Sequence, residues 1–391
     1  MISTRASNLL GKISEEQISY LDSLHRVMAH LATEKYLQRI DQEATYPYEL
    51  YKAWVDLGLF RIGFPEEYGG IGGDLTDLLL ISQELATWSY DIYSAYSVPL
   101  YTGLTLLKIG NEDQKRKYLP ALMDGKIRLS TSISEPAAGS DVSAIKTLAT
   151  PVEGGWILNG QKLWNTAAGV KDNVLQVLAL TDTSVSPRAG MSMFLVPNDT
   201  PGVECRKLNM LGRRGTGTYE VFFTDVFAPQ ESLVGDINKG WKGLLACLQT
   251  ERVLTSAGYV GSAQKVVDIS LQYAKDRSQF GRSIGEFQSI SHMLVDMQTE
   301  VDASRLLVER AASLIISGAD ATREVSMAKL FGSETYARVS NNGMQIFGAY
   351  GYSMEYEIQR HFRDSRSTTV GAGSSQIQRN TIAGTMGLKP H

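Results

Sequence analysis

The sequence predicts a mainly α-helical protein with a small β domain at its centre. Apolar residues recur at helical spacing through residues 1–125 and again from about residue 240. Between these regions, residues 126–236 contain short apolar runs bounded by Gly, Asn, Asp and Pro, which is typical of strands. The 391 residues therefore divide into an N-terminal helical domain (1–125), a β-barrel-like middle domain (126–236) and a C-terminal four-helix bundle (237–391).

The first region is expected to contain four helical segments. The first begins at Ser14, whose hydroxyl forms a capping box with Gln17 three residues later. The other three are residues 49–60, 74–88 and 112–123, with a loop rich in Gly and Pro at residues 65–70.

The middle and last regions differ in their periodicity. Strands are expected at residues 129–133, 156–158, 174–180, 191–196 and 218–227. Helices are expected at residues 251–276, 290–315, 323–344 and 376–386, with a break at residues 318–320.

The composition excludes several classes of protein. The chain is 43% hydrophobic and 20% charged, with a net charge of −4, so we expect no nucleic-acid or anionic-membrane binding. Its two cysteines argue against a disulfide framework, and its five histidines show no metal-ligand spacing. The N-terminus lacks the apolar core of a signal peptide, and no apolar run is long enough to span a membrane. We therefore expect a cytoplasmic protein without a metal.

The most informative stretch runs from Leu129 to Thr147, LSTSISEPAAGSDVSAIKT. It begins as a strand and breaks at Glu135-Pro136 into small residues, which allow a bound group to approach the backbone. Several hydroxyls beside this break can donate or accept hydrogen bonds. An ordinary strand followed by a small-residue turn has the same local pattern.

Four further motifs follow this stretch in order. They are Trp164-Asn165-Thr166 in NGQKLWNTAAG, RSQFG at residues 277–281, QIFGAYG at residues 345–351 and SSQIQR at residues 374–379. In this order and spacing, the five motifs resemble those of the acyl-CoA dehydrogenase family of flavoproteins. The resemblance covers nearly the whole chain. It implies the three-domain fold of that family and an FAD cofactor.

The resemblance also implies which residues hold FAD. A flavin needs hydrogen bonds to its ring edge, an aromatic or apolar wall, and positive groups for its pyrophosphate. The residues expected around the ring are Thr131, Ile133, Ser134, Gly139, Ser140, Trp164, Asn165 and Thr166. Those expected at the pyrophosphate and adenine, from a neighbouring subunit, are Arg277, Gln279, Phe280, Gln345, Gly348 and Gly351, completed by Ser374 and Gln376. A shared site of this kind implies a homo-oligomer, a tetramer as in the family.

The family's reaction is α,β-dehydrogenation of an acyl thioester, which needs a carboxylate base. Many members carry this base as the Glu of a Tyr-Glu-Gly segment near the C-terminus, where this chain has Gly371-Ala372-Gly373. Isovaleryl-CoA, long-chain and carnitine-type members instead place a Glu before an Arg in the first bundle helix, which Glu251-Arg252 matches. Taken alone, Glu251-Arg252 also reads as a surface charge pair at a helix start. We predict that Glu251 is the base.

The resemblance leaves the substrate and the electron acceptor open. Ser140, Arg252 and Gly373 are expected to bind the substrate, and the small residues at 371–373 leave room for a branched, cyclic or polar acyl group. Tyr93, Tyr96, Ser97 and Tyr101 indicate a polar pocket floor.

Three questions remain open: the carrier of the acyl group, the electron acceptor and whether the protein oxidises its substrate. The acyl group is carried by CoA or, as in aminoacyl-carrier-protein dehydrogenases and oxidases of secondary metabolism, by a carrier protein. Electrons pass to electron-transfer flavoprotein or to oxygen. A non-oxidising relative, meaning a reductase, an eliminase or a binding protein, is the third alternative, although such a protein would not need Glu251.

Overall fold

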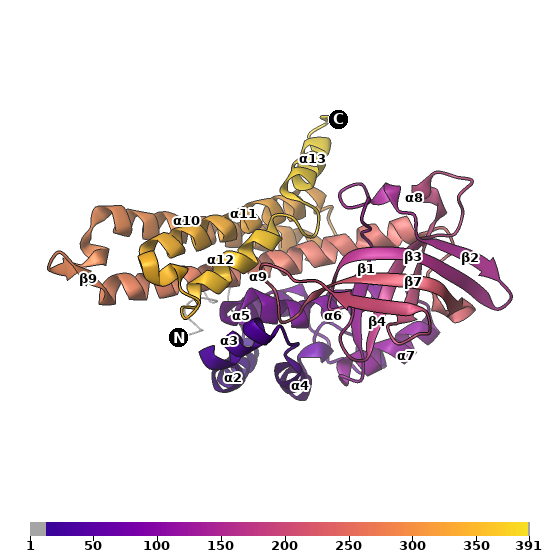
Figure 1. Cartoon of the computed structure of the whole chain (residues 1–391), viewed down its shortest axis with the longest axis horizontal. Coiled ribbons are helices and arrows are strands. Elements are labelled where there is room, and N and C mark those ends of the chain that lie inside the picture. Colours follow the sequence, from indigo (N-terminus) through magenta and orange to yellow (C-terminus); the bar gives the residue numbers. More distant parts are fainter. Residues whose placement is uncertain (1–12, 390–391) are drawn as a thin grey trace.

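The computed structural model describes residues 13–389, apart from the side chains of residues 246 and 247. Residues 1–12, part of the stretch in which no signal peptide is expected, and the side chain of Cys247 therefore lie outside the description. The predicted fold class is confirmed: a helical N-terminal region, a β region and a helical C-terminal region follow one another. Figure 1 shows helix α9 (Gly240–Asp276) running along the molecule, with the β region at one end and the first helices beneath it.

The N-terminal region is helical, and its first cap is as predicted. The Ser14 hydroxyl accepts the Gln17 N–H at 3.1 Å, and the Gln17 side chain accepts the Ser14 N–H at 3.1 Å. Helix α4 ends at Asp56, earlier than expected, because Gly58 adopts a left-handed conformation. The helices are α2 (Glu15–Leu31), α3 (Glu34–Glu43), α4 (Tyr48–Asp56), α5 (Leu75–Trp88), α6 (Tyr90–Ile109) and α7 (Glu112–Met123), with 3₁₀ turns at Leu59–Arg61 and Glu66–Tyr68.

The β region is one mixed sheet of eight strands in the order β6-β7-β3-β2-β4-β5-β8, with β1 paired in parallel to β4. Each predicted strand is present. The strands are β1 (Arg128–Ser132), β2 (Leu148–Val152), β3 (Gly155–Thr166), β4 (Asn173–Leu180), β5 (Met191–Pro197), β6 (Val203–Lys207), β7 (Thr218–Pro229) and β8 (Leu233–Val234), with a short helix α8 at Pro187–Gly190 and 3₁₀ turns η3 (Val142–Ala144) and η4 (Gln230–Ser232). β1 packs against α6, so this strand lies between the sheet and the helices.

The C-terminal region is a bundle of α9, α10 (Gln288–Ile316), α11 (Thr322–Phe347) and α12 (Ile358–Thr368), and α13 (Ser375–Thr385) packs on α11. A small hairpin, β9 (Ser278–Gln279) and β10 (Arg282–Ser283), and the 3₁₀ turn η5 (Ile284–Glu286) join α9 to α10, and a 3₁₀ turn η6 covers Gly348–Tyr352. The return to helix at about residue 240 is confirmed, since α9 begins at Gly240 and so extends the helix expected at 251–276. The short helix expected at 376–386 is present as α13, but the fourth helix of the bundle is α12, which was not predicted.

Helix α12 escapes apolar pattern matching because ion pairs, not apolar side chains, fix its inner face. Arg360 pairs with Glu34 at 2.9 Å, and Arg363 pairs with Asp41. Both arginine side chains are largely buried. A helix of this composition has no apolar stripe to find in the sequence.

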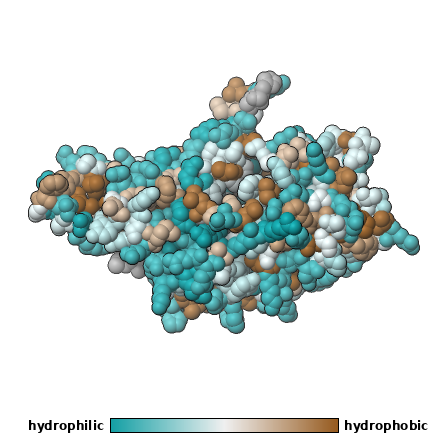
Figure 2. Space-filling model, viewed as in Figure 1, coloured by the Kyte–Doolittle hydropathy of each residue, from teal (hydrophilic) through white to brown (hydrophobic). Residues whose placement is uncertain are grey.

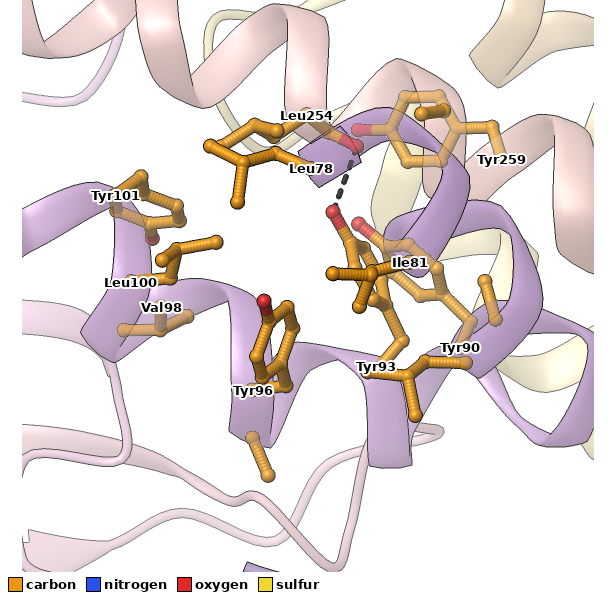
Figure 3. Packing of buried hydrophobic residues seen from close by; sticks show 14 of the residues in the cluster. Leu78, Ile81, Tyr90, Tyr93, Tyr96, Val98, Leu100, Tyr101, Leu254 and Tyr259 are labelled. Atoms are coloured by element: carbon orange, nitrogen blue, oxygen red, sulfur yellow. Dashed lines mark hydrogen bonds between the residues drawn. The ribbon is translucent and has the colours of Figure 1, made fainter. Parts of the chain in front are cut away.

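Helices α5, α6 and α9 form the centre of the main core. Figure 3 shows tyrosines of α6 facing Leu254 and Tyr259 of α9, and Leu78 and Ile81 of α5. The buried Tyr93 hydroxyl donates to the Leu254 carbonyl at 2.7 Å. None of the described helices combines the length and the apolar character needed to cross a membrane.

We expect Gly261→Ala to destabilise the protein, because α9 touches α5 at this residue. A Cβ there would lie 2.2 Å from the Gln83 carbonyl oxygen, a backbone atom that cannot rotate away. The expected loss in the free energy of unfolding is about 2–3 kcal/mol, as in other overpacked cores. The matched control is Gly384→Ala on α13, where a Cβ meets nothing within 4 Å. This control should gain up to about 1 kcal/mol, since Ala favours helix over Gly. Urea unfolding measures both, and equal effects would contradict the packing.

Candidate active site

Glu251 lies on α9 at the junction of α6, α11 and the turn before α13. Its side chain is partly buried, and no ion pair within 4.0 Å joins it to another residue of the described chain. Burial raises the pKa of the Glu251 carboxyl, while the positive charges of Arg252, Lys329 and Arg213 and a hydrogen bond from Tyr101 oppose the rise. A carboxyl with a raised pKa in a poorly solvated site suits a general base.

The turn at residues 371–373 is held beside Glu251 by donors from three helices. The Arg252 Nε donates to the Ala372 carbonyl at 3.1 Å, and the Lys329 Nζ donates to the Gly373 carbonyl at 2.7 Å. The Gln378 amide, on α13, donates to both carbonyls. Ala372 and Gly373 have φ angles of 55° and 83°, so the turn is left-handed at both residues. Ala372 brings no carboxylate, which leaves Glu251 as the acid group next to the turn.

Lys329 is fully buried, and a variant can separate the effect of its positive charge on Glu251 from its structural hydrogen bond to the turn. Burial and the charge of Arg252 lower the pKa of the Lys329 ammonium to about 8. Because its positive charge holds down the pKa of Glu251, we expect Lys329→Met to shift the acid limb of the rate–pH profile to higher pH. The profile should rise with pH in both proteins, since a base acts when deprotonated. Stopped-flow flavin reduction across pH measures the shift.

The matched control is Gln378→Met, which removes uncharged hydrogen bonds to the same turn. It should lower the rate without moving the profile. An identical profile in Lys329→Met and wild type would show that the ammonium acts only as a structural hydrogen-bond donor.

A buried ion pair anchors the loop after β1. The Lys162 Nζ lies 2.8 Å from the Glu135 Oε1 and donates to the Ile133 carbonyl at 3.0 Å. The same carboxylate accepts the N–H groups of Lys146 and Thr147 at 2.6 and 2.9 Å. Burial raises the pKa of Glu135, but Lys162 outweighs it and holds that pKa below its ordinary value. The pair therefore ties β3 to both ends of the loop at residues 135–147.

Residues expected around the flavin ring surround this anchored loop. Four hydroxyls make no hydrogen bond within the described chain: those of Thr131, Ser134, Ser140 and Thr166. Gly139 and Ser140 are exposed, and a Cβ at Gly139 meets nothing within 4 Å. Ile133 is partly buried beside them.

Trp164 lies at an irregularity in the pairing of β3 with β7. It has a φ angle of 65°, and 56% of its surface is exposed, whereas its neighbour Asn165 is buried and donates to the Tyr219 carbonyl at 3.4 Å. A bulge of this kind re-aims one side chain out of the strand. Thr166 lies on the same strand, and the N–H of the neighbouring Leu163 bonds to the Ser134 carbonyl. An exposed indole and unengaged hydroxyls fit a flat, polar-edged ring system such as the isoalloxazine of FAD.

The residues expected at the pyrophosphate and adenine gather elsewhere. Arg277, Gln279 and Phe280 follow α9 at the end of the molecule opposite the β region (Figure 1). Phe280 is 93% exposed, and Figure 2 shows hydrophobic surface at this same end. The segment carrying Gln345, Gly348 and Gly351 joins them, because Tyr350 lies 5.5 Å from the Arg277 guanidinium and Phe347 stacks on Tyr273 at 4.2 Å.

One chain therefore does not bring the two groups of predicted flavin residues together. Glu251 and Arg277 are separated along α9 by roughly 40 Å of helix. Ser374 and Gln376 belong to the first group by position, since they open α13 beside the turn at 371–373. The Ser374 hydroxyl caps α13 by accepting the Ile377 N–H at 3.3 Å, and Gln376 is exposed.

Sequence reasoning missed two cations of the site, Lys329 and Arg213. Lys329 lies on the buried stripe of α11 among Val325, Ala328 and Tyr336. A lone lysine on an otherwise apolar helical face is a signal that could have found it. Arg213 lies in a loop between two strands, and only its contacts in the fold distinguish it from the next residue, Arg214.

Comparisons with known proteins give the same family from residue 14 to residue 387. Three family models match: the acyl-CoA dehydrogenase N-terminal domain at residues 14–126, the middle domain at 130–226 and the C-terminal domain at 238–387. A probable acyl-CoA dehydrogenase of Bacillus subtilis, YngJ, is 37% identical over 348 residues, which cover 88% of this chain and 91% of that protein.

Two further similar proteins are named for other activities. The CarC subunit of the caffeyl-CoA reductase–Etf complex of Acetobacterium woodii is 36% identical over 90% of this chain and 93% of its own length. The crystal structure of the prolyl acyl carrier protein oxidase AnaB superimposes with a TM-score of 0.90 at 27% identity, covering 96% of this chain and 100% of that chain. With all three family models matched in order, this chain belongs to the acyl-CoA dehydrogenase family.

Proposed function

We propose that the protein catalyses the α,β-dehydrogenation of an acyl thioester with Glu251 as the base. The chain is an oxidoreductase acting on CH–CH groups, and its cofactor is FAD. The observation that carries the proposal is the placement of Glu251: a carboxyl of raised pKa beside the turn at residues 371–373, where Ala372 supplies no acid. Arg252 and Lys329 keep that turn in place.

The residues of this chain account for the proton. The Cα–H bond of the acyl group breaks, its proton goes to the Glu251 carboxylate, and the electron pair forms the Cα=Cβ bond as the β-hydrogen leaves with its own pair. Bound FAD supplies the acceptor for that hydride. The nearby charges of Arg252, Lys329 and Arg213 favour the carboxylate form of Glu251 and oppose the rise in its pKa that burial causes. The residues around Trp164 and Ser140 would hold the flavin ring, and Arg252, Ser140 and Gly373 the thioester.

We infer that the working form is an oligomer, a tetramer of this chain. The two groups of flavin residues lie at opposite ends of one chain (Figure 1), so a second copy must supply the group at Arg277. The exposed Phe280 and the hydrophobic surface around it suit burial against a partner. Light scattering of the FAD-loaded protein tests this, and a monomer that holds FAD would contradict it.

The proposed reaction is tested by the product. Incubation with an acyl thioester and an artificial electron acceptor should give the α,β-unsaturated thioester, lacking two hydrogens. Presenting one acyl group on CoA and on an acyl carrier protein then identifies the carrier by the ratio of kcat/KM values. Electron-transfer flavoprotein and oxygen are compared as acceptors in the same way. An enzyme that forms no unsaturated product from any thioester would contradict the proposal.

A second candidate is the reverse reaction, reduction of an enoyl thioester. The similarity to the caffeyl-CoA reductase complex subunit favours it. Glu251 would then give its proton to the α-carbon. Supplying an unsaturated thioester with reduced electron-transfer flavoprotein tests this direction, and a rate below that of oxidation would place the enzyme among the dehydrogenases.

A further inference from the structure

Arg213, in the loop between β6 and β7, is a half-buried cation that forms no ion pair with the described residues. Its Nε is buried and makes no hydrogen bond, and no ion pair within 4.0 Å reaches its guanidinium from the described residues. The guanidinium lies 5.5 Å from the ring centroid of Tyr90, the first residue of α6. A buried N–H without an acceptor is costly, and an oxygen of a bound ligand would satisfy the Arg213 Nε.

The two carboxylates nearest this loop are engaged with its backbone. Asp91 accepts the N–H groups of Gly215 and Thr216 at 2.7 and 3.0 Å, and Asp364 accepts the N–H of Arg213 at 2.6 Å. A Cβ on Gly215 would lie 2.4 Å from Ile40, so the loop is pressed against the helices. Arg213 itself has a φ angle of 54°. The backbone of Arg213 is therefore fixed while its guanidinium remains available.

The guanidinium of Arg213 contacts the first turn of α6, the helix that also carries Tyr101. Its charge is among those that oppose the burial-raised pKa of Glu251. Tyr101 donates a hydrogen bond to the Glu251 carboxyl and is also close enough to Arg213 to raise the pKa of its guanidinium. Figure 3 shows Tyr90 and Tyr101 on α6, with Tyr101 at the left of the view and Tyr90 at the right. Arg213 and Tyr101 thus act on Glu251 from the β6–β7 loop and from α6, while Arg252 follows Glu251 on α9 and Lys329 acts from α11.

We propose that Arg213 binds an oxygen on the acyl tail, so that the substrate is a thioester whose acyl group ends in a carboxylate or carbonyl. This inference rests on the proposed function, because it places the α-carbon at Glu251. With the thioester at the turn of residues 371–373, the tail is the part of the substrate left to reach Arg213. The planar fork of a guanidinium matches such oxygens and holds them in one orientation.

A bland role for Arg213 is to neutralise Glu251 directly. An ion pair of that kind would bring the two groups within 4 Å, yet no such contact exists in the described chain. The Arg213 charge lowers the pKa of Glu251 without such a contact, although burial outweighs it and leaves that pKa raised. Arg213 is therefore close enough to tune the base but remains free to bind another oxygen.

The test uses S-acyl pantetheines, since pantetheine is the part shared by CoA and carrier proteins. Chains of four to six carbons are made in three forms that end in a methyl, a carboxamide or a carboxylate. For the FAD-loaded wild type, we expect an oxygen-bearing end to exceed the methyl end in kcat/KM by about 10- to 100-fold, the usual range for a charge-assisted hydrogen bond. If the carboxylate-ended substrate has the highest kcat/KM, Arg213 pairs with a negative charge. If the carboxamide-ended substrate has the highest kcat/KM, Arg213 binds a neutral carbonyl oxygen.

Variants separate Arg213 from the general charge of the loop. Arg213→Met should bring the ratio of oxygen-bearing to methyl-ended substrates near one, mainly through KM, and Arg213→Lys should give an intermediate ratio. The matched control is Arg214→Met, because the Arg214 guanidinium reaches only the Gln42 carbonyl, at 3.5 Å. It should keep the wild-type ratio.

Calorimetric titration with the corresponding unsaturated thioesters gives a second readout that does not need turnover. A wild type that prefers the methyl end at every length, or an Arg213→Met variant whose ratio is unchanged in both assays, would overturn the inference. Those results would leave the proposed dehydrogenation unaffected. If no thioester reduces the flavin, but the wild type still binds oxygen-bearing thioesters more tightly than methyl-ended ones, only the proposed function is overturned.

Discussion

Glu251→Gln should slow flavin reduction by an acyl thioester by about 10²–10⁴-fold, the range that general bases contribute, while FAD remains bound. Glutamine fills the same volume between α6 and α11 and keeps a hydrogen-bond acceptor for Tyr101, but it cannot take the α-proton. Anaerobic stopped-flow measurement of the flavin absorbance gives the rate, and the unchanged visible spectrum before mixing shows that the site is intact.

Glu309 on α10 provides the matched control. Burial raises the pKa of this glutamate to about 7, but it does not adjoin the turn at residues 371–373 or the loop after β1. Glu309→Gln should therefore reduce its flavin within about twofold of the wild-type rate, since a raised pKa without the right position does no chemistry. A Glu251→Gln enzyme that reacts as fast as the control would remove Glu251 from the mechanism.

Lys162→Met should destabilise the protein by about 3–5 kcal/mol and weaken FAD binding, because it leaves the buried Glu135 carboxylate without its cation. That carboxylate also holds the N–H groups of Lys146 and Thr147, so its loss of ionisation would loosen the loop that carries Ser140. Urea unfolding of the protein without FAD gives the stability, and titration with FAD gives the affinity.

The double variant Lys162→Met with Glu135→Gln separates charge from packing. Because it removes both charges, it should recover part of the loss in unfolding free energy seen in Lys162→Met alone. Strictly additive effects of the two substitutions would show that the pair does not couple β3 to the loop.

The elements with a clear period were predictable, and those fixed by long-range contacts were not. Helix α7 and the strands β1, β4, β5 and β7 match their predicted positions because turn residues bound each of them in the sequence, whereas β3 is longer than predicted and β2, β6 and β8 were not predicted. Helix α6 is buried on nearly all sides and α12 is buried through arginine ion pairs, so neither shows an amphipathic stripe.

The site divides in the same way. Glu251 could be predicted because the family resemblance supplied its position and Ala372 provides no carboxylate at the other known position of the base. The loop after β1 could be predicted from its small residues. The roles of Lys329 and Arg213 depend on residues distant in the sequence that the fold brings near them. Gly373 lies next to Lys329, and Tyr90 lies next to Arg213. No local pattern holds that information. The separation of the two flavin groups likewise emerges only from the length and direction of α9.

The most direct test of the central claim is the visible spectrum of the purified protein under anaerobic conditions, recorded while acyl thioesters on pantetheine, CoA and a carrier protein are added. We expect a yellow protein whose flavin absorbance is bleached by at least one of them, with the unsaturated thioester formed in equal amount. A protein that cannot be loaded with FAD, or a yellow protein that no thioester bleaches, would contradict the assignment of an acyl-thioester dehydrogenase.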